Sequence, residues 1–574
     1  MARNLESRPY TAWQLIKSYW QSDYRKSAYL FSLGIVLFTL AIVAMDVVFT
    51  YWMNYFYDSL QQYNAREAIK LLVIFFILAT IYIVLQVYRY YVSQYFGLRW
   101  RRWLTEQIVN RWLQNRSYYY LEIFDGRIDN PDQRIQEDIG SLVIYSLNLA
   151  TGLVSALATF FAFIYVLWQL SGHIHIDLGS WGTYNIHGYL VWVALVYCAI
   201  GSVLTIKIGR PLISLNFEQQ RREATFRFAA VDLRSHAEDV ALYRGEEHQK
   251  NILQRLFDRV LENWYFIILR QKLLLWFTAG FNQLSVALPL LVALPNYFSK
   301  VFELGGLIQS IRAFSSVQDA LSFLINSYTT IAEWQAMTRR LITFLDHVYD
   351  AERDAAAQNQ LVYHQDQQNI IQTKDLQIFK PNHEELLKNI NQEFKHGGNY
   401  LIKGMSGVGK STLIRTIAGI WPYAAGEIDL PQQQNIMYVP QKPYMPLGTF
   451  AEALMFPDKT HNGTQEDLQK ILQAVGLSYF GNRLQDVAAW SQQLSPGEQQ
   501  RVAFARVLIH QPDWVFLDES TSALDLNSEK ELYQLLKTKL PNCSIISVGH
   551  RPSLDAYHEN VVDLTQYSVQ EQPA

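Results

Sequence analysis

The segment that most constrains this chain is rich in glycine, Gly404-Met-Ser-Gly-Val-Gly-Lys-Ser411, and fits G-x-x-x-x-G-K-[ST] at every fixed position. Glycines at these positions let backbone N–H groups turn toward phosphates, and Lys410 would supply a charge for the β- and γ-phosphates. An apolar stretch precedes the segment, and residues 412–418 have helical spacing, so phosphates would lie at a helix N-terminus. A simple glycine-rich turn is the alternative, and only further motifs can exclude it.

A second motif supplies acidic side chains at the end of an apolar strand. Residues 514–519 read Trp-Val-Phe-Leu-Asp-Glu, so Asp518 and Glu519 follow directly on a buried strand. Phosphoryl transfer to water needs a ligand for Mg²⁺ and a base for the attacking water. We expect Asp518 to serve the metal together with Ser411, and Glu519 to be the base.

Between these motifs lies Leu494-Ser-Pro-Gly-Glu498, followed by Gln-Gln-Arg501. With this segment the chain resembles the nucleotide-binding domain of ATP-binding cassette (ABC) transporters. The resemblance implies ATP and Mg²⁺ as ligands, Gln441 as a further metal contact and His550 at the γ-phosphate. It also implies that Phe379 stacks on adenine. The residues expected to bind ATP are Gly404, Ser406, Gly407, Gly409, Lys410, Ser411, Thr412, Gln441, Ser495, Gly497, Asp525 and Phe379, and those expected in catalysis are Glu519, His550 and Lys410.

Residues 494–498 match the signature segment of this family, which commonly reads Leu-Ser-Gly-Gly-Gln. This chain departs from that sequence at two places, where it has Pro496 and Glu498. Ser495 and Gly497 are kept, and in the family these two positions reach the γ-phosphate bound to a second subunit. Because the contacting groups are present, we expect hydrolysis to survive the departures.

The rest of the chain has the composition of a membrane protein. Of 574 residues, 50% are hydrophobic, 14% are aromatic and only 18% are charged, a richer apolar content than soluble enzymes have. The net charge of −3 gives no reason to expect a nucleic-acid partner, and two cysteines cannot form a disulfide framework. Stretches near the ~20 residues that cross a bilayer are 29–51, 71–95, 142–170, 190–208 and 273–293, with a sixth, 304–332, interrupted by polar residues.

The charges between these stretches predict orientation. Lys and Arg are concentrated in residues 1–28, 97–140 and 207–272, and are scarce in the alternate connections. The positive-inside rule then places the N-terminus and the ATPase half in the cytoplasm, with six spans. We expect an amphipathic elbow helix in 1–28, a six-helix membrane domain of exporter type in 29–345, a polar linker in 346–372 and an α/β P-loop ABC ATP-binding domain in 373–574.

Segments in both halves, among them Glu238-Asp-Val-Ala-Leu-Tyr-Arg-Gly245 and Ala418-Gly-Ile-Trp-Pro-Tyr423, resemble the ABC subfamily D half-transporters of peroxisomes and lysosomes. Bacterial relatives of that subfamily are the BacA/SbmA-related proteins that carry an ATPase domain, including the YddA group, and residues Trp52 to Leu60 resemble that branch. The resemblance implies a bacterial inner-membrane location and bulky or hydrophilic cargo such as peptides or cobalamin. Fatty acyl-CoA, as in the peroxisomal branch, is the alternative.

Polar residues in the sixth stretch suggest where cargo binds. Gln309, Arg312, Ser316 and Asp319 fall on one helical face. Ionisable groups in a membrane need water or a partner, so we expect this face to line a cargo cavity, with an internal ion pair as the alternative.

Two other polar features of the membrane half are Asp46 and a group of outer-loop residues. Asp46 lies near the outer boundary of the first span, and we favour an interfacial role for it over a proton site. An outer-loop group, His173, His175, Asp177 and His187, lacks regular ligand spacing, so a metal site there is not expected.

One phosphate loop and one signature per chain cannot complete an ATP site of this family, because ATP there is sandwiched between subunits. We therefore expect a homodimer in the lipid bilayer that couples ATP hydrolysis to transport. The direction of transport stays open. An ATP-dependent membrane sensor that moves no cargo, and a proton-driven importer, are the alternatives.

Overall fold

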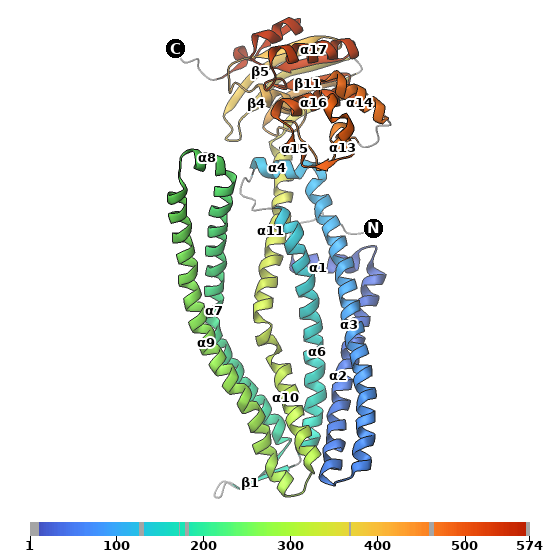
Figure 1. Cartoon of the computed structure of the whole chain (residues 1–574), viewed down its shortest axis with the longest axis vertical. Coiled ribbons are helices and arrows are strands. Elements are labelled where there is room, and N and C mark those ends of the chain that lie inside the picture. The colour runs from blue at the N-terminus through green and yellow to red at the C-terminus, as the bar shows by residue number, and fades with distance from the viewer. Residues whose placement is uncertain are drawn as a thin grey trace. The chain divides into compact units, whose positions relative to one another are not determined.

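The computed structural model describes residues 11–124, 131–171, 173–177, 183–366, 369–458 and 464–569, which form two compact units (Figure 1). The first unit comprises residues 1–114 and 128–347, and the second comprises 115–127 and 348–574. The second unit therefore includes a short segment, 115–127, that lies within the predicted membrane half of the sequence.

The first unit is helical apart from one hairpin. Its elements are α1 (Ala12–Gln21), α2 (Arg25–Gln61), α3 (Ala65–Leu113), α5 (Pro131–Gln133), η2 (Arg134–Asp138), α6 (Ile139–Ser171), β1 (His173–Asp177), β2 (Thr183–His187), α7 (Tyr189–Ser235), α8 (Ala237–Leu242), α9 (Glu246–Phe298), α10 (Leu304–Asn326) and most of α11 (Tyr328–Gln358). Helices α3, α7 and α9 have 49, 47 and 53 residues. At 1.5 Å per residue each is about 70–80 Å long, far more than a bilayer core of ~30 Å requires.

Among the residues that the structure describes, five helical segments are long and apolar enough to cross a membrane, and they contain α2, α3, α6, α7 and α9. The sixth predicted span corresponds to α10, a continuous helix of 23 residues that does not meet this criterion. Helix α10 packs against α2, α6, α7 and α9 (Figure 1), and its Ala313, Phe314 and Val317 are fully buried. A helix surrounded by other helices needs little lipid-facing apolar surface, which explains its weak hydropathy. The count of six spans stays a prediction.

The described part of the predicted elbow segment is helix α1. Thr11 begins it with a capping box to Gln14, which satisfies backbone groups that would otherwise lack partners. Leu15 and Tyr19 face the unit and are buried, whereas Trp13 is 68% exposed. The alternation of buried and exposed faces is that of a helix lying on a surface.

The second unit combines two larger sheets and the two-stranded pair β9–β10 with surrounding helices. Its elements are η1 (Gln114–Arg116, which starts at the boundary), α4 (Ser117–Phe124), β3 (Gln360–Asp366), β4 (Ile370–Phe379), β5 (Glu385–Lys395), β6 (Asn399–Lys403), α12 (Lys410–Ile417), β7 (Ala424–Pro431), β8 (Ile436–Val439), β9 (Gly448–Thr449), α13 (Phe450–Met455), α14 (Gln465–Ala474), η4 (Ser478–Arg483), β10 (Val487–Ala488), α15 (Trp490–Gln493), α16 (Pro496–His510), β11 (Trp514–Asp518), α17 (Leu526–Lys539), β12 (Ser544–Val548), η5 (Pro552–Tyr557), β13 (Asn560–Asp563) and η6 (Leu564–Tyr567).

One sheet has the strand order β13-β6-β12-β11-β8, with all pairs parallel. The other has the order β3-β7-β4-β5. In the parallel sheet the neighbouring strands β6, β12 and β11 end just before the glycine-rich loop, His550 and Glu519, respectively. Ligands of open parallel sheets bind at the carboxyl ends of the strands, so the topology gathers these three motifs at one edge.

The segment expected to be a linker, 346–372, contains regular secondary structure. Helix α11 continues to Gln358, and strand β3 follows at once and pairs with β7. Its polar composition suggested a linker, but Ala351 and Ala355 are buried along the helix. A polar helix with a narrow apolar stripe has the average composition of a linker, and only the packing separates the two.

Candidate functional site

The glycine-rich loop connects β6 to α12 through positive-φ residues. Gly404 has φ +151° and Gly409 has φ +110°, conformations that side chains disfavour. A Cβ at position 409 would also lie 2.9 Å from Leu386 Cδ2. Helix α12 begins at Lys410, so the loop presents backbone N–H groups and a helix N-terminus at the same place. Of the other predicted ligands, Ser406 is exposed in the loop and Thr412 lies in the first turn of α12.

The Lys410 ammonium lies within the loop. Its Nζ donates to the carbonyl oxygens of Gly404 at 2.8 Å and Met405 at 2.9 Å, and the residue is only 8% exposed. A lysine held this way is a fixed positive charge directly beside the backbone that would surround phosphates.

Ser411 and Asp518 form the pair predicted for a metal. Ser411 Oγ donates to Asp518 Oδ1 at 2.9 Å, across from α12 to the end of β11. Burial raises the pKa of Asp518; the hydrogen bond from Ser411 opposes this change, and the charge of Glu519 adds to it. A bound cation would relieve the cost of that buried charge.

The donor set fits Mg²⁺ bound together with phosphates. Within the described ranges, no group of three or more His, Cys, Asp or Glu side chains could hold a metal alone. Magnesium commonly takes one or two protein oxygens and completes its shell with water and phosphate oxygens. Ser411 and Asp518 provide those protein oxygens.

The carboxylate of Glu519 is held from two sides. Gln441 Nε2 donates to Glu519 Oε2 at 2.8 Å, and His550 Nδ1 lies 3.6 Å from Glu519 Oε1. Glu519 has φ +45°, a conformation that costs energy for a residue with a side chain and that is found often at functional sites. The structure therefore brings together three residues that are far apart in the sequence.

The signature segment begins helix α16. Ser495 is the N-cap; it accepts from Glu498 N at 3.3 Å, and Glu498 Oε2 accepts from Ser495 N at 2.7 Å. Pro496 occupies the first helical position, where its missing N–H and fixed φ cost nothing, so this departure from the common motif suits the helix start. Burial acts to raise the pKa of Glu498, but hydrogen bonds from Tyr479 and Ser495 outweigh it and lower that pKa.

Two residues that the sequence analysis missed hold the segment 521–524 after Glu519. Gln500 Oε1 accepts from Ala523 N at 2.9 Å, and its Nε2 donates to Ser522 Oγ at 3.1 Å. Arg551 donates to the carbonyls of Ser522 and Leu524 at 2.7 and 2.8 Å. In the sequence, both residues lie next to recognised motifs: Gln500 is near the start of α16, just after the signature segment, and Arg551 directly follows His550.

The remaining predicted ATP contacts lie at element ends. Asp525 caps α17 by accepting from Asn527 N and Ser528 N, and hydrogen bonds, the strongest from the Ser528 hydroxyl, lower the pKa of its carboxyl. Gly497 comes so close to the 521–524 segment that a Cβ would lie 3.3 Å from Ala523 O. Phe379 ends β4, is partly buried, and its carbonyl accepts from Trp421 Nε1 at 3.0 Å. Its contact with adenine stays a prediction.

Helix α4 belongs to the same compact unit as this site. Arg116 Nη1, just before α4, donates to Gly419 O at 3.0 Å beyond the end of α12. At the other end of α4, the rings of Phe124 and Tyr423 lie 5.4 Å apart. Both contacts reach the segment that follows α12, whose N-terminus carries Lys410.

The predicted cargo face of α10 is divided. Arg312 and Asp319 are exposed, but Gln309 and Ser316 are buried. Gln309 accepts a hydrogen bond from Asn54 of α2. The spacing was compatible with one face, but α10 contacts helices on several sides, so a single stripe meets different surroundings along its length.

Asp46 and Arg312 line the same cavity, of about 300 Å³, together with Tyr82. The sequence alone does not relate Asp46 to Arg312, because nothing in it indicates that α2 and α10 line one cavity. Of the outer-loop group, the side chains of His173, His175 and Asp177 lie outside those that the structure describes.

Comparison with known families and proteins agrees with this geometry. Residues 15–298 match the family model "ABC transporter transmembrane region 2", and residues 387–522 match the model "ABC transporter". The chain is 33% identical to the Escherichia coli inner membrane ABC transporter ATP-binding protein YddA, over 96% of each chain. It is 36% identical to an uncharacterized ABC transporter ATP-binding protein of Haemophilus influenzae, over 92% of this chain and 88% of that protein.

Two more distant similarities are also to ABC transporters. The lysosomal cobalamin transporter ABCD4 of Mus musculus is 28% identical over 81% of this chain and 80% of its own length. The solved structure of a bacterial Atm1-family ABC exporter with ATP bound matches with a TM-score of 0.71 and 18% identity, over 96% of this chain and 95% of that chain. This last similarity establishes the exporter-type fold.

The motifs at the sheet edge, the membrane helices in the same chain and the full-length relatives lead to one conclusion. The chain belongs to the ABC transporter family, as an ATP-driven transporter of exporter-type fold with its membrane and ATPase domains fused.

Proposed function

We propose that two copies of this chain form a homodimer that moves a bulky or hydrophilic molecule across a bacterial inner membrane. The observation that carries the proposal is the exposure of two complementary surfaces in each chain. Met405, Ser406 and Gly407 of the glycine-rich loop are exposed, and so are Ser495 and Pro496 of the signature. A second copy can therefore cover each loop with its signature and complete two equivalent sites.

A second exposed surface supports the same assembly. Leu242 at the end of α8 is 75% exposed and the adjoining Tyr243 is 88% exposed. These two side chains are adjacent, and we propose that a partner ATPase domain covers them. We propose that α4 and α8 carry the coupling between ATP hydrolysis and movement in the membrane domain.

In the ATP site, the proposed roles follow the observed contacts. Mg²⁺, held by Ser411 and Asp518 with Gln441 nearby, would supply charge neutralisation for the phosphates. Lys410 and the loop N–H groups bind and orient the phosphates. Glu519 accepts the proton of the attacking water, and Gln441 and His550 keep its carboxylate in place.

The proposed cargo is a peptide or a cobalamin-like molecule. Support comes from the charged groups of Arg312, Asp319 and Asp46 in the membrane domain, and from the similarity to the lysosomal cobalamin transporter ABCD4. We place the N-terminus and the ATPase domain in the cytoplasm on the basis of the positive-inside rule.

The test is transport in vesicles containing the purified chain in known orientation. Labelled peptides and labelled cobalamin are supplied with ATP and Mg²⁺ on the side of the ATPase domain, and the Lys410→Ala variant is the control. Movement of either label that needs ATP and is lost in the control supports the proposal. Cargo movement that persists in Lys410→Ala and stops with an uncoupler would overturn it, and so would ATPase activity without any movement.

A further inference from the structure

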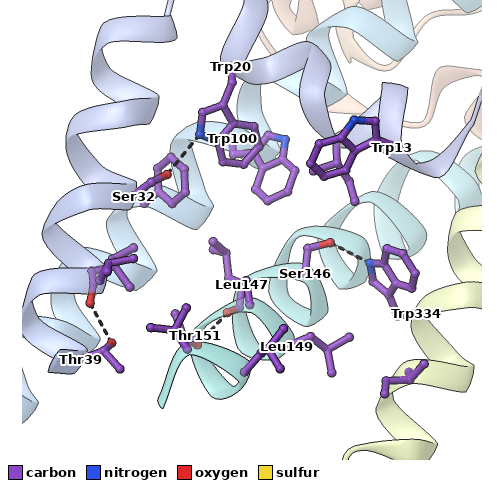
Figure 2. A pocket seen from close by; sticks show the side chains of 18 of the residues that line it. Trp13, Trp20, Ser32, Thr39, Trp100, Ser146, Leu147, Leu149, Thr151 and Trp334 are labelled. Atoms are coloured by element: carbon purple, nitrogen blue, oxygen red, sulfur yellow. Dashed lines mark hydrogen bonds between the residues drawn. The ribbon is translucent and has the colours of Figure 1, made fainter. Parts of the chain in front are cut away.

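A second cavity in the first unit has no part in the ATP site or in the charged face of α10. Its volume is about 420 Å³, within the roughly 300–1,000 Å³ range of small-molecule sites. Helices α1, α2, α3, α6, α10 and α11 all contribute to its wall, and indole rings gather around it (Figure 2). It shares no lining residue with the cavity of Asp46 and Arg312.

The serine and threonine hydroxyls of this wall are already hydrogen-bonded. Ser32 accepts from Trp20 Nε1 at 3.2 Å, and Ser146 accepts from Trp334 Nε1 at 2.8 Å (Figure 2). The two threonines of the wall donate to carbonyl oxygens four residues earlier in their own helices. The other lining side chains are apolar. A cavity whose few hydroxyls are occupied attracts water weakly and favours hydrocarbon.

One polar group in the wall, the indole N–H of Trp100, has no hydrogen-bond partner among the described residues. Trp100 is 1% exposed. The ring lies against Trp20, with centroids 5.0 Å apart, and Figure 2 shows it between Trp20 and Trp13. Burying an N–H without an acceptor is costly, so an occupant of the cavity would gain from bringing an acceptor oxygen.

The place of the cavity identifies the source of the occupant. Helix α1 covers it with Trp13, Ile16 and Trp20, and α2, which starts at Arg25, is an expected span. Trp13 also remains 68% exposed, as aromatic residues do where a protein meets lipid headgroups. Along α2, the lining residues run from Ser32 to Thr39, about 10 Å at 1.5 Å per residue, so the cavity extends along the direction of an acyl chain.

We propose that this cavity binds one acyl chain of a membrane phospholipid, whose ester carbonyl accepts a hydrogen bond from Trp100 Nε1. The hydrocarbon fills the apolar wall, and the ester lies near α1, where the polar part of the lipid reaches the membrane surface. Because Trp334 belongs to α11, which runs without a break to Gln358 and β3, the bound lipid contacts the helix that continues into the ATPase unit.

The first test changes the volume of the cavity. Ala150 of α6 lines it, and Ala150→Trp places an indole in the space. Leu157→Trp is the matched control, since Leu157 is on the same helix, is 50% exposed and is not part of the wall. Phospholipid that stays with the full-length protein after exhaustive detergent exchange is counted by native mass spectrometry. We expect about one phospholipid per chain in wild type and Leu157→Trp, and a loss of about tenfold in occupancy in Ala150→Trp.

The second test needs no cavity-filling variant. Wild type is loaded with a diester phospholipid or with its diether analogue, which has the same chains and headgroup but no carbonyl. We expect several-fold preference for the ester in wild type and none in Trp100→Phe, which keeps an aromatic ring and removes the donor. Equal retention in Ala150→Trp and wild type would overturn the proposal. So would retention of free fatty acid in place of phospholipid, or equal ester and ether binding in wild type.

Discussion

Gln441 Nε2 donates a hydrogen bond to Glu519 Oε2 at 2.8 Å, joining the segment after β8 to the acid that directly follows β11. The bond ties the orientation of the proposed base to a residue that also stands among the expected metal contacts. His550 approaches the other carboxylate oxygen at 3.6 Å. A change in the contacts of a bound Mg²⁺ or γ-phosphate would therefore alter the orientation of the Glu519 carboxylate.

Glu519→Gln should lower ATP turnover by about 10² or more, the size expected for a lost general base. The amide keeps the shape of the side chain, and the glycine-rich loop that binds the phosphates is untouched. ATP affinity should therefore persist, and nucleotide should accumulate in a closed dimer. The measurement is steady-state ATPase activity together with the amount of nucleotide retained after gel filtration. Near-normal turnover without retained nucleotide would contradict the assignment of the base.

Lys410→Ala should abolish ATPase activity and transport while the protein stays folded. Among the described residues the ammonium donates to the loop carbonyls of Gly404 and Met405, and Met405 is 52% exposed, so water can reach these carbonyls when the lysine is removed. Nucleotide binding by fluorescence and thermal unfolding of the same sample separate the two effects. Transport above half of the wild-type rate would refute the ATP-driven mechanism.

Arg312→Ala should reduce the stimulation of ATPase activity by cargo and leave the basal rate close to that of wild type. Arg312 is exposed and lines a cavity with Asp46, so its guanidinium is available to a ligand. Arg312→Lys, which keeps the charge, is the control and should retain part of the response. If basal activity and folding are lost together in Arg312→Ala, the residue has the alternative role of an internal ion pair.

Arg116→Ala should weaken the link between ATP hydrolysis and transport. It removes the hydrogen bond to Gly419 O beside α4, and bonds from charged donors are worth about 1.5–3 kcal/mol before exposure reduces them. We expect less cargo moved per ATP hydrolysed, with ATP affinity unchanged. Arg102→Ala is the matched control, because Arg102 is exposed and forms its ion pair with Glu106, four residues away in α3. Equal loss of coupling in both variants would argue against a role for the Arg116 contact.

The motifs that the structure gathers at the edge of the parallel sheet were predictable because each motif is local. Each motif spans only a few residues: the glycines of the loop, the acids after residues 514–517, and Ser495 with the helix start that it caps. The turn, strand end or helix start that each motif requires is determined by the residues of that segment. Parallel strands then bring segments that end in such motifs to one edge of the sheet. Apolar length likewise predicted the five segments that can cross a membrane.

Contacts between distant segments could not be predicted in this way. The sequence does not indicate that Gln500 and Arg551 hold the 521–524 segment, or that Asp46 and Arg312 line one cavity. Helix α10 is buried among its neighbours although its own hydropathy is weak, and α11 continues into the expected linker as far as Gln358, with two of its alanines buried there. Local motifs determine chemistry and backbone conformation by themselves, whereas the burial of a side chain depends on which other segments pack against it, and only the tertiary structure decides that.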